Sequence, residues 1–387
     1  MRVSTVRAVH RLAARWAGAL PWDGRDTVLS ATGVWPLLAF LADGAAGPAR
    51  GELEDALGLP ADRAAEAARE LLAGITAVRG VASAVGLWAR QGLELRAPWV
   101  AGLPDATLGR FTGDEAADRK ALDAWAAERT QGLIPSMPVT VDEGTELVLA
   151  SAQSVRTTWL RPFRAYETEP ERGPWAGRTI SYLYRTTSLL DRVGVAETAA
   201  GPLTVLKVLG DTGVDVHLLL GGEAADGGTV LRAGLDVLGG GTPVVTGDRL
   251  PLGEPGPGLS VDTVPSTGRD PLLTVSTPAF SLAAEHDLLA HRAVFGLTSA
   301  SDTGRGHFPG VAEEPLAIGQ ARQSATARFD AEGFAAASVT GFAAAAGCPP
   351  VRYRVRRVGL TVDRPFGFLA VHRTSRLVLT AGWVAQP

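Results

Sequence analysis

Apolar positions recur at helical spacing in the first quarter of the chain and predict four helices there. In residues 2–20 they fall on one face, at Val6, Val9, Leu12, Ala13 and Trp16. Residues 34–41 are apolar on nearly all sides, which predicts a buried helix. Two further helices are expected over residues 48–57, which begin at a proline, and 62–78, with Asp62 as the N-cap.

The rest of the chain follows a mainly β pattern, in which only residues 122–129 and 228–238 are expected to be helical. Strands are predicted at residues 27–30, 81–88, 147–155, 180–184, 203–209, 214–220, 272–276, 367–371 and 377–384. Helices therefore dominate the first third and strands the remainder, which indicates an α+β fold. No linker-like segment or internal repeat divides the sequence, so we expect one domain over residues 1–387.

One stretch near the C-terminal end fits neither pattern cleanly. Residues 328–332 alternate like a strand, Gly333 offers a turn, and a run of small residues continues to Pro349-Pro350. Alanine favours helix, but a helix here would have no charged face and no stop signal before the prolines. The other interpretation is an exposed loop whose small side chains could fit as a strand in a tight space.

Composition and charge narrow the function classes. The chain has 387 residues, 46% hydrophobic and 20% charged, with a net charge of −4 and no basic block, so we expect no nucleic-acid partner. No stretch approaches the ~20 apolar residues of a membrane span. Arginines interrupt every apolar run of the N-terminus, so no signal peptide is evident. We expect a cytoplasmic protein without a membrane partner.

Motifs for catalysis, metals and cofactors are not found. The sequence contains no His-Glu-x-x-His, no Gly-x-Ser-x-Gly and no phosphate-binding glycine loop, so we expect neither an enzyme nor a cofactor. Cys348 is the only cysteine, which rules out an intrachain disulfide. His286 and His291 are the closest histidines, and we expect surface or capping roles for them rather than metal binding. The nine tryptophans are dispersed, as is typical of core packing.

Five segments, in order along nearly the whole chain, resemble the serpin family, and specifically its bacterial-type members. They are Leu29–Val34 with Gly44–Arg50; Leu122–Trp125 with Thr130–Ile134; Leu147–Ser151; Trp159 with Arg161-Pro162-Phe163; and Val362–Leu369 with Ala381–Val384. The resemblance implies three β-sheets, about eight to nine helices and an exposed reactive-centre loop at about residues 333–358. It also implies a metastable, monomeric inhibitor of serine proteases. In this family the loop is cleaved as bait and then inserts into the central sheet as a new strand.

The resemblance assigns the hinge of that loop to residues Ala331, Glu332, Gly333, Phe334, Ala335, Ala336, Ala337 and Ser338. An inserting strand alternates its faces, so Phe334, Ala336, Ser338 and Thr340 would point inward. About ten new hydrogen bonds at roughly 1 kcal/mol each would drive insertion. Phe334 departs from the small residue that inhibitors of the family carry there, and Ala331 replaces their usual glutamate.

The resemblance also locates a sheet-opening region and a reactive bond. The sheet-opening region would comprise Ser30, Ser151, Trp159 and Gln323, of which Ser151 and Gln323 differ from the family's usual residues. Counting from Gly333 places the bond at Gly347–Cys348, and aligning the prolines places it at Ala346–Gly347. A small residue before the bond suits an elastase-like or subtilisin-like protease.

Arginines farther along the loop leave a second possibility. Arg352 or Arg354 could be the bait of a trypsin-like protease, or residues 351–355 could form an exposed edge strand. Because of Phe334 and Ala331, we also consider a non-inhibitory binding or scaffold protein with the serpin fold. An enzyme on this fold, with Cys348 as nucleophile, is the least favoured reading, since no histidine lies near it in the sequence.

Overall fold

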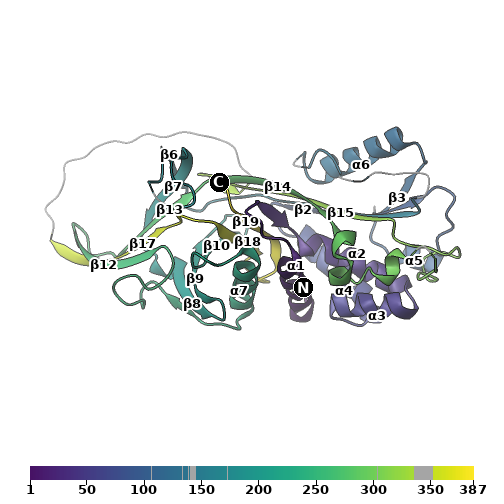
Figure 1. The fold of residues 1–387 in the computed structure, drawn as a ribbon, viewed down its shortest axis with the longest axis horizontal. Helices are drawn as coiled ribbons and strands as arrows, with labels where there is room; N and C mark the ends of the chain where they lie inside the picture. Colours follow the sequence, from purple (N-terminus) through teal and green to yellow (C-terminus); the bar gives the residue numbers. More distant parts are fainter. Residues whose placement is uncertain are drawn as a thin grey trace.

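The computed structural model describes residues 1–105, 107–132, 134–137, 139, 145–171, 173–302, 304–334 and 352–387. The molecule is elongated, with a long central sheet along its upper side, most helices below one half and the other two sheets in the other half (Figure 1). The described residues form three sheets and eight α-helices, which confirms the α+β prediction.

The helices follow the hydrophobic periodicity closely. Their bounds are α1 Val3–Ala19, α2 Ala31–Gly44, α3 Gly47–Leu57, α4 Ala61–Thr76, α5 Ala97–Ala101, α6 Glu115–Arg129, α7 Gly227–Gly239 and α8 Arg292–Phe295. All five predicted apolar positions of α1 are buried, and α2 is buried over almost its whole surface. The prediction of Asp62 as an N-cap was wrong: Pro60 occupies that position of α4, and Asp62 lies in the first turn.

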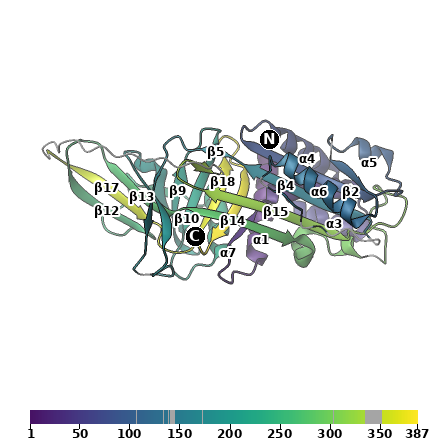
Figure 2. The ribbon, with the colours of Figure 1, turned by 90° about the horizontal axis from the view of Figure 1, so that it is seen from above.

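The central sheet contains β3 Leu108–Phe111, β2 Val81–Arg90, β4 Leu147–Val155, β15 Gln320–Phe329 and β14 Phe280–Asp287, paired in that order. Two short strands, β5 Thr157–Thr158 and β16 Gly333–Phe334, extend it at one end. Seen from above, β2, β4, β15 and β14 run side by side along the molecule (Figure 2).

The other two sheets form the opposite half. One has the order β1-β19-β18-β10-β9-β8-β11, with bounds Thr27–Leu29, Val378–Val384, Phe366–His372, Val214–Leu220, Gly201–Val208, Val193–Thr198 and Val244–Thr246. The other has the order β12-β17-β13-β7-β6, with bounds Leu259–Ser266, Tyr353–Thr361, Leu272–Pro278, Ile180–Thr187 and Arg164–Thr168. Residues 353–355 belong to β17 and pair with β12, whereas the pairing of β17 with β13 begins only at Arg357, so the start of β17 is paired on one side, as an edge strand is.

The hydrophobic core is continuous across α1, α2 and the inner faces of all three sheets. A smaller cluster, including Trp88 and Leu122, lies beneath α6. Seven of the nine tryptophans have at most 9% of their surface exposed, at positions 16, 35, 88, 99, 159, 175 and 383. The prediction that tryptophans serve core packing is confirmed for these seven.

Candidate functional site: the seam of the central sheet and its hinge

The centre of the large sheet contains a parallel seam between β4 and β15. The two strands pair directly from Val148–Gln320 to Gln153–Ala325, with no strand between them. Their other neighbours, β2 and β14, pair with them antiparallel. Parallel pairing is slightly less stable per residue than antiparallel pairing. A strand inserted between β4 and β15 and antiparallel to both would therefore improve the local pairing.

Residues 330–334, which include the start of the expected hinge, lie at the end of this seam where β15 finishes. After β15 the chain turns at residues 330–333, where the N–H of Asp330 donates to the Gly333 carbonyl at 3.0 Å. The Asp330 carboxylate accepts from the N–H groups of Glu332 and Gly333, both at 3.0 Å. Gly333-Phe334 then forms β16, which pairs antiparallel with β15 on one side and β5 on the other. β16 thus occupies the first rung of the position that an inserted strand would take.

The segment from Trp159 to Phe163 holds the hinge turn through three hydrogen bonds. The Trp159 backbone N–H donates to the Glu332 carbonyl at 2.8 Å, and its indole N–H donates to the Asp330 carbonyl at 2.9 Å. The Phe163 N–H donates to the Ala331 carbonyl at 2.8 Å. Trp159 is therefore at the hinge end of the sheet, with Ala331 and Glu332.

Phe334 faces inward and is 1% exposed. Its ring centroid lies 6.0 Å from that of Phe368 on β18. Phe368 in turn contacts Phe280, which stacks on Phe329 at 5.3 Å. Phe334 therefore belongs to an aromatic cluster that joins the central sheet to the sheet beneath it.

A hydrogen-bond network crosses the middle of the seam. Gln323 Oε1 accepts from the Ser30 N–H, and its Nε2 donates to the Ser30 carbonyl, both at 2.8 Å. The same Nε2 lies 3.2 Å from Ser151 Oγ. The structure thus brings together Ser30, Ser151 and Gln323, which are 1–2% exposed, and ties both seam strands to the start of α2.

Gln153 belongs to the same network, and the sequence reasoning missed it. Ser30 Oγ donates to its Oε1, and no acceptor among the described residues contacts its Nε2. Gln153 is 6% exposed on a strand whose nine residues are all buried. The increase in polarity along residues 147–155 was the available signal.

The reactive-bond residues Ala346, Gly347 and Cys348 lie outside the described residues, as do hinge residues 335–338. Of the alternative bait residues, Arg352 directly precedes β17, and its N–H donates to the Ser266 carbonyl at 3.1 Å. Arg354 lies within β17 opposite Pro265, and its guanidinium donates to the Thr263 carbonyl at 3.1 Å. The Arg354 backbone is thus part of a sheet.

The histidines differ from expectation at one position. His286 is 8% exposed, its ring lies 5.0 Å from that of Trp16, and its Nε2 is 2.9 Å from the Val28 carbonyl oxygen. Burial lowers its pKa. The expected surface or capping role was therefore wrong for His286, because β14 turns it into the core.

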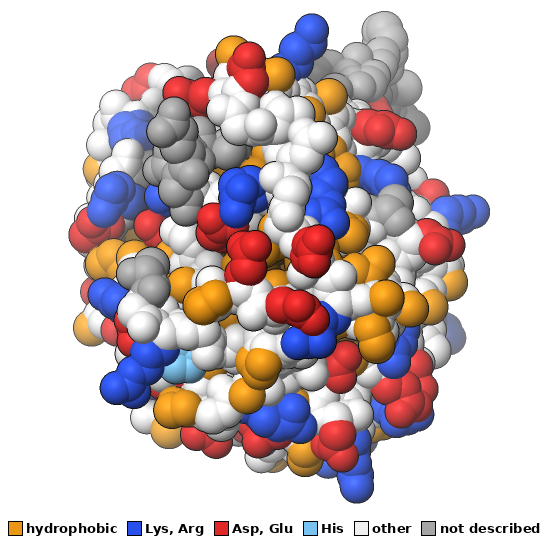
Figure 3. Space-filling view, turned by 90° about the vertical axis from the view of Figure 1, so that its right-hand side faces the viewer, with side chains coloured by type: hydrophobic (Ala, Val, Ile, Leu, Met, Phe, Trp, Pro, Cys, Tyr) orange, Lys and Arg blue, Asp and Glu red, His pale blue; other side chains and the backbone are white. Residues whose placement is uncertain are grey.

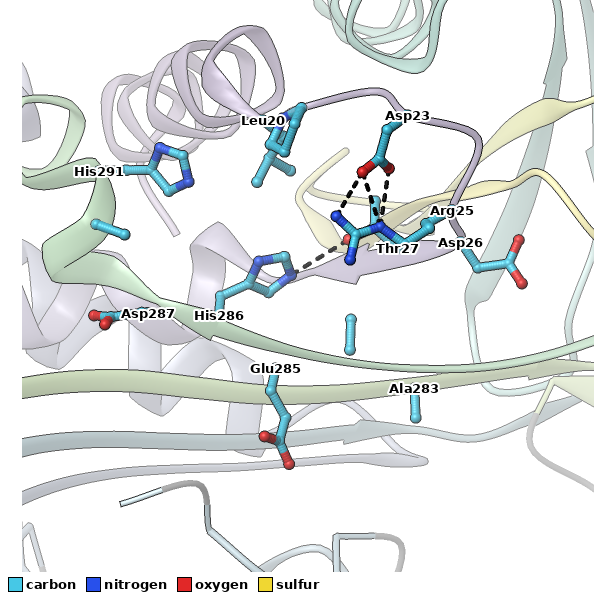
Figure 4. A pocket seen from close by; sticks show the side chains of 13 residues that line it. Leu20, Asp23, Arg25, Asp26, Thr27, Ala283, Glu285, His286, Asp287 and His291 are labelled. Carbon is cyan, nitrogen blue, oxygen red and sulfur yellow. Dashed lines mark hydrogen bonds and ion pairs between the residues drawn. The ribbon is translucent and has the colours of Figure 1, made fainter. Parts of the chain in front are cut away.

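A cavity of about 350 Å³ lies beside His286, between the end of β14 and the connection from α1 to β1. Figure 4 shows His291 at its edge and the Asp23–Arg25 ion pair across from it. Within the described residues no group of three or more His, Cys, Asp or Glu could hold a metal ion. In the same part of the chain, no helix is both long and apolar enough to span a membrane.

The described surface at the helical end of the molecule carries both positive and negative side chains. Figure 3 shows acidic and basic side chains interspersed over this face, with apolar side chains scattered among them.

The fold combines eight α-helices among the described residues with three sheets, and residues 330–334 lie at the end of the β4–β15 pairing. Comparison of the sequence with known protein families assigns the chain to one of them. The model of the family described as "Serpin (serine protease inhibitor)" matches residues 8–173 and 263–387. The chain belongs to the serpin family.

Individual relatives agree with this assignment. Human plasminogen activator inhibitor 2 is 27% identical over 275 residues, covering 70% of this chain and 60% of that protein. The putative serpin-Z12 of Oryza sativa is 26% identical over 411 residues, covering 100% and 91%.

Solved structures confirm the serpin fold. Human thyroxine-binding globulin complexed with thyroxine superposes with a TM-score of 0.76 at 16% identity, covering 100% of this chain and 98% of that one. The thermophilic serpin tengpin in its native state gives 0.75 at 14%, covering 99% and 93%. At these identities the similarity concerns the fold alone.

Proposed function

We propose that this chain is a suicide-substrate inhibitor of serine proteases. In this proposal a protease cleaves the loop that follows β16, and the residues directly after Phe334 then enter the seam between β4 and β15 as a new strand. The observation that carries the proposal is the alignment of β16 with the closed β4–β15 seam. Continuing the Phe329–Phe334 register down β15 would place Ser338 opposite Ala325 and Thr340 opposite Gln323. These inward positions are filled by small side chains in the sequence.

The favoured targets are elastase-like or subtilisin-like proteases. Small residues precede both candidate bonds, Gly347–Cys348 and Ala346–Gly347. A protease must bind its substrate in an extended form, and the backbone of Arg354 is already hydrogen-bonded to β12. This pairing supports the small-residue bonds over Arg354.

The experiment mixes the purified protein with elastase or subtilisin and looks for a complex that survives boiling in detergent. Two matched variants separate insertion from cleavage. Thr340→Arg would place a charge at an inward position of the inserted strand, whereas Val339→Arg would place it on the outward face. We expect the wild type and Val339→Arg to form the complex and Thr340→Arg to be cleaved without forming it. Cleavage of the wild type with no stable complex would rule out inhibition of that protease.

A non-inhibitory serpin is the second candidate, and the buried side chain of Phe334 favours it. The first inward position is filled by a buried ring, so the residues after Phe334 would have to enter the seam next to a side chain already packed in the aromatic cluster. The melting temperature before and after loop cleavage distinguishes the two functions. A large rise supports insertion, and an unchanged value supports a non-inhibitory role.

A further inference from the structure

A small cavity beside the hinge-holding segment is lined by four basic side chains. Its volume is about 80 Å³, and its basic residues are Arg161, Arg185, Arg192 and Lys207. The remaining lining consists of Thr187 and three leucines, at positions 160, 189 and 209. Among the described residues, no acidic one belongs to this lining, which carries four basic side chains.

The positive charges are poorly compensated within the protein. In the part of the chain that the structure describes, only Arg192 of the four has a carboxylate within ion-pair distance, that of Asp191 at 3.4 Å. Arg161 and Arg185 instead donate to uncharged acceptors, Thr187 Oγ1 at 2.9 Å and the Arg161 carbonyl at 2.7 Å. The Nε atoms of Arg185 and Arg192 are buried and contact no acceptor among the described residues.

Arg185 is the most constrained of the four. Its guanidinium carbon lies 4.2 Å from the centroid of the Phe163 ring, on which it stacks. Burial, and then the nearby charge of Arg161, lower its pKa to about 10. A cationic group that is buried without a counter-ion is costly, and a bound anion would offset that cost.

We infer that this cavity is a binding site for a small oxyanion, either a phosphate or a carboxylate group. Guanidinium groups match the geometry of both through paired N–H donors. The volume exceeds the ~30 Å³ that one water molecule occupies in the liquid, which leaves room for a compact anion. Leu160 and Leu189 of the lining are 56% and 37% exposed, and Arg161 is exposed as well, so the cavity opens to solvent.

The site is physically connected to the hinge. Arg161 lies between Trp159 and Phe163, whose backbone N–H groups hold Glu332 and Ala331. Arg185 packs on the ring of Phe163, which belongs to the same segment. An anion bridging Arg161 and Arg185 would fix this segment in its hinge-holding position and so stabilise the closed seam.

Inorganic phosphate is the first probe, compared with chloride at equal ionic strength. We expect phosphate to raise the melting temperature of the wild type by about 3 °C at a hundredfold excess over its Kd. Phosphate should also slow hydrogen exchange at the amides of Trp159 and Phe163. Acetate and citrate form the second arm and show whether the site prefers phosphate or carboxylate.

The variants test the location of the site. Arg161→Gln combined with Lys207→Gln should weaken phosphate binding about tenfold or more, measured by calorimetry. Arg164→Gln, an exposed arginine outside the lining, should leave it unchanged. An equal response to phosphate and chloride, or an unchanged Kd in the double variant, would overturn the inference. None of these measurements requires a protease, so their failure is distinguishable from failure of the proposed inhibitory function.

Discussion

The ring of Phe334 lies 6.0 Å from that of Phe368, and this contact anchors the hinge of the loop in the core between two sheets. Phe334 is on β16, above the seam of the central sheet, and Phe368 is on β18. The first inward position of the loop is therefore already inserted and filled by a large side chain. Further insertion would start from this rung.

Replacing Phe334 with Thr should destabilise the described state by about 2–4 kcal/mol, because it removes a buried aromatic ring and leaves a cavity. Urea unfolding measures this change. If the chain is an inhibitor, the same variant should form the protease complex faster, since the hinge is released. Leu252→Ser, at a side chain 66% exposed, is the control and should change stability little. Unchanged stability in Phe334→Thr would contradict the anchoring role.

Replacing Gln323 with Leu should cost about 2–4 kcal/mol, because it leaves the buried Ser30 N–H without an acceptor and removes the shorter of two hydrogen bonds to the Ser30 carbonyl, which keeps the Gly33 N–H. Ser151→Ala removes only the longer 3.2 Å contact and should cost about 1 kcal/mol or less. Denaturation midpoints of the two variants, measured side by side, test this ranking. Equal costs would mean that the Ser30 contacts do not hold the seam.

Acid should destabilise the protein through His10. Its pKa is lowered to about 4, first by burial and then by the charge of Arg376, and its Nε2 accepts from the Val378 N–H. Between pH ~6.5 and ~4 the unfolded chain binds a proton that the folded chain does not. The free energy of unfolding should therefore fall as the pH falls, by about 1.4 kcal/mol per pH unit from this group.

The variant His10→Gln isolates that contribution, because glutamine still offers an acceptor to Val378 but does not titrate. Its stability should depend less steeply on pH over this range than that of the wild type. Parallel pH profiles for the two proteins would exclude His10 as a source of the dependence.

Limited proteolysis should cut the loop before β17. We expect elastase or subtilisin to cleave next to Ala346 or Gly347, as read by mass spectrometry of the released fragment. Arg352→Gln and Arg354→Gln should not alter that pattern. Efficient trypsin cleavage after Arg354 would show that the start of β17 unfolds locally. It would favour Arg354 as the residue before the reactive bond, with a trypsin-like protease as the target.

The sequence by itself determined the features that depend on local pattern. The apolar face of α1, the buried helix α2 and the change from helix to strand follow from side-chain periodicity, which is visible in a short window. The serpin resemblance led us to expect a hinge over residues 331–338 and a sheet-opening region at Ser30, Ser151, Trp159 and Gln323. Strands β14 and β15 were missed almost entirely, because the inward side chains of β15 are mostly alanine and glutamine rather than strong strand formers.

The tertiary structure decided everything that requires distant segments to meet. The seam is closed because β4 and β15, far apart in the chain, pair directly. The burial of His286 depends on the packing of β14 against α1, and the basic cavity depends on β7 and β9 reaching the segment after β5. Phe334 looked like an obstacle in the sequence. In the fold its ring is buried against Phe368, which also contacts Phe280. These residues are far apart in the sequence, so no local pattern could reveal the contact.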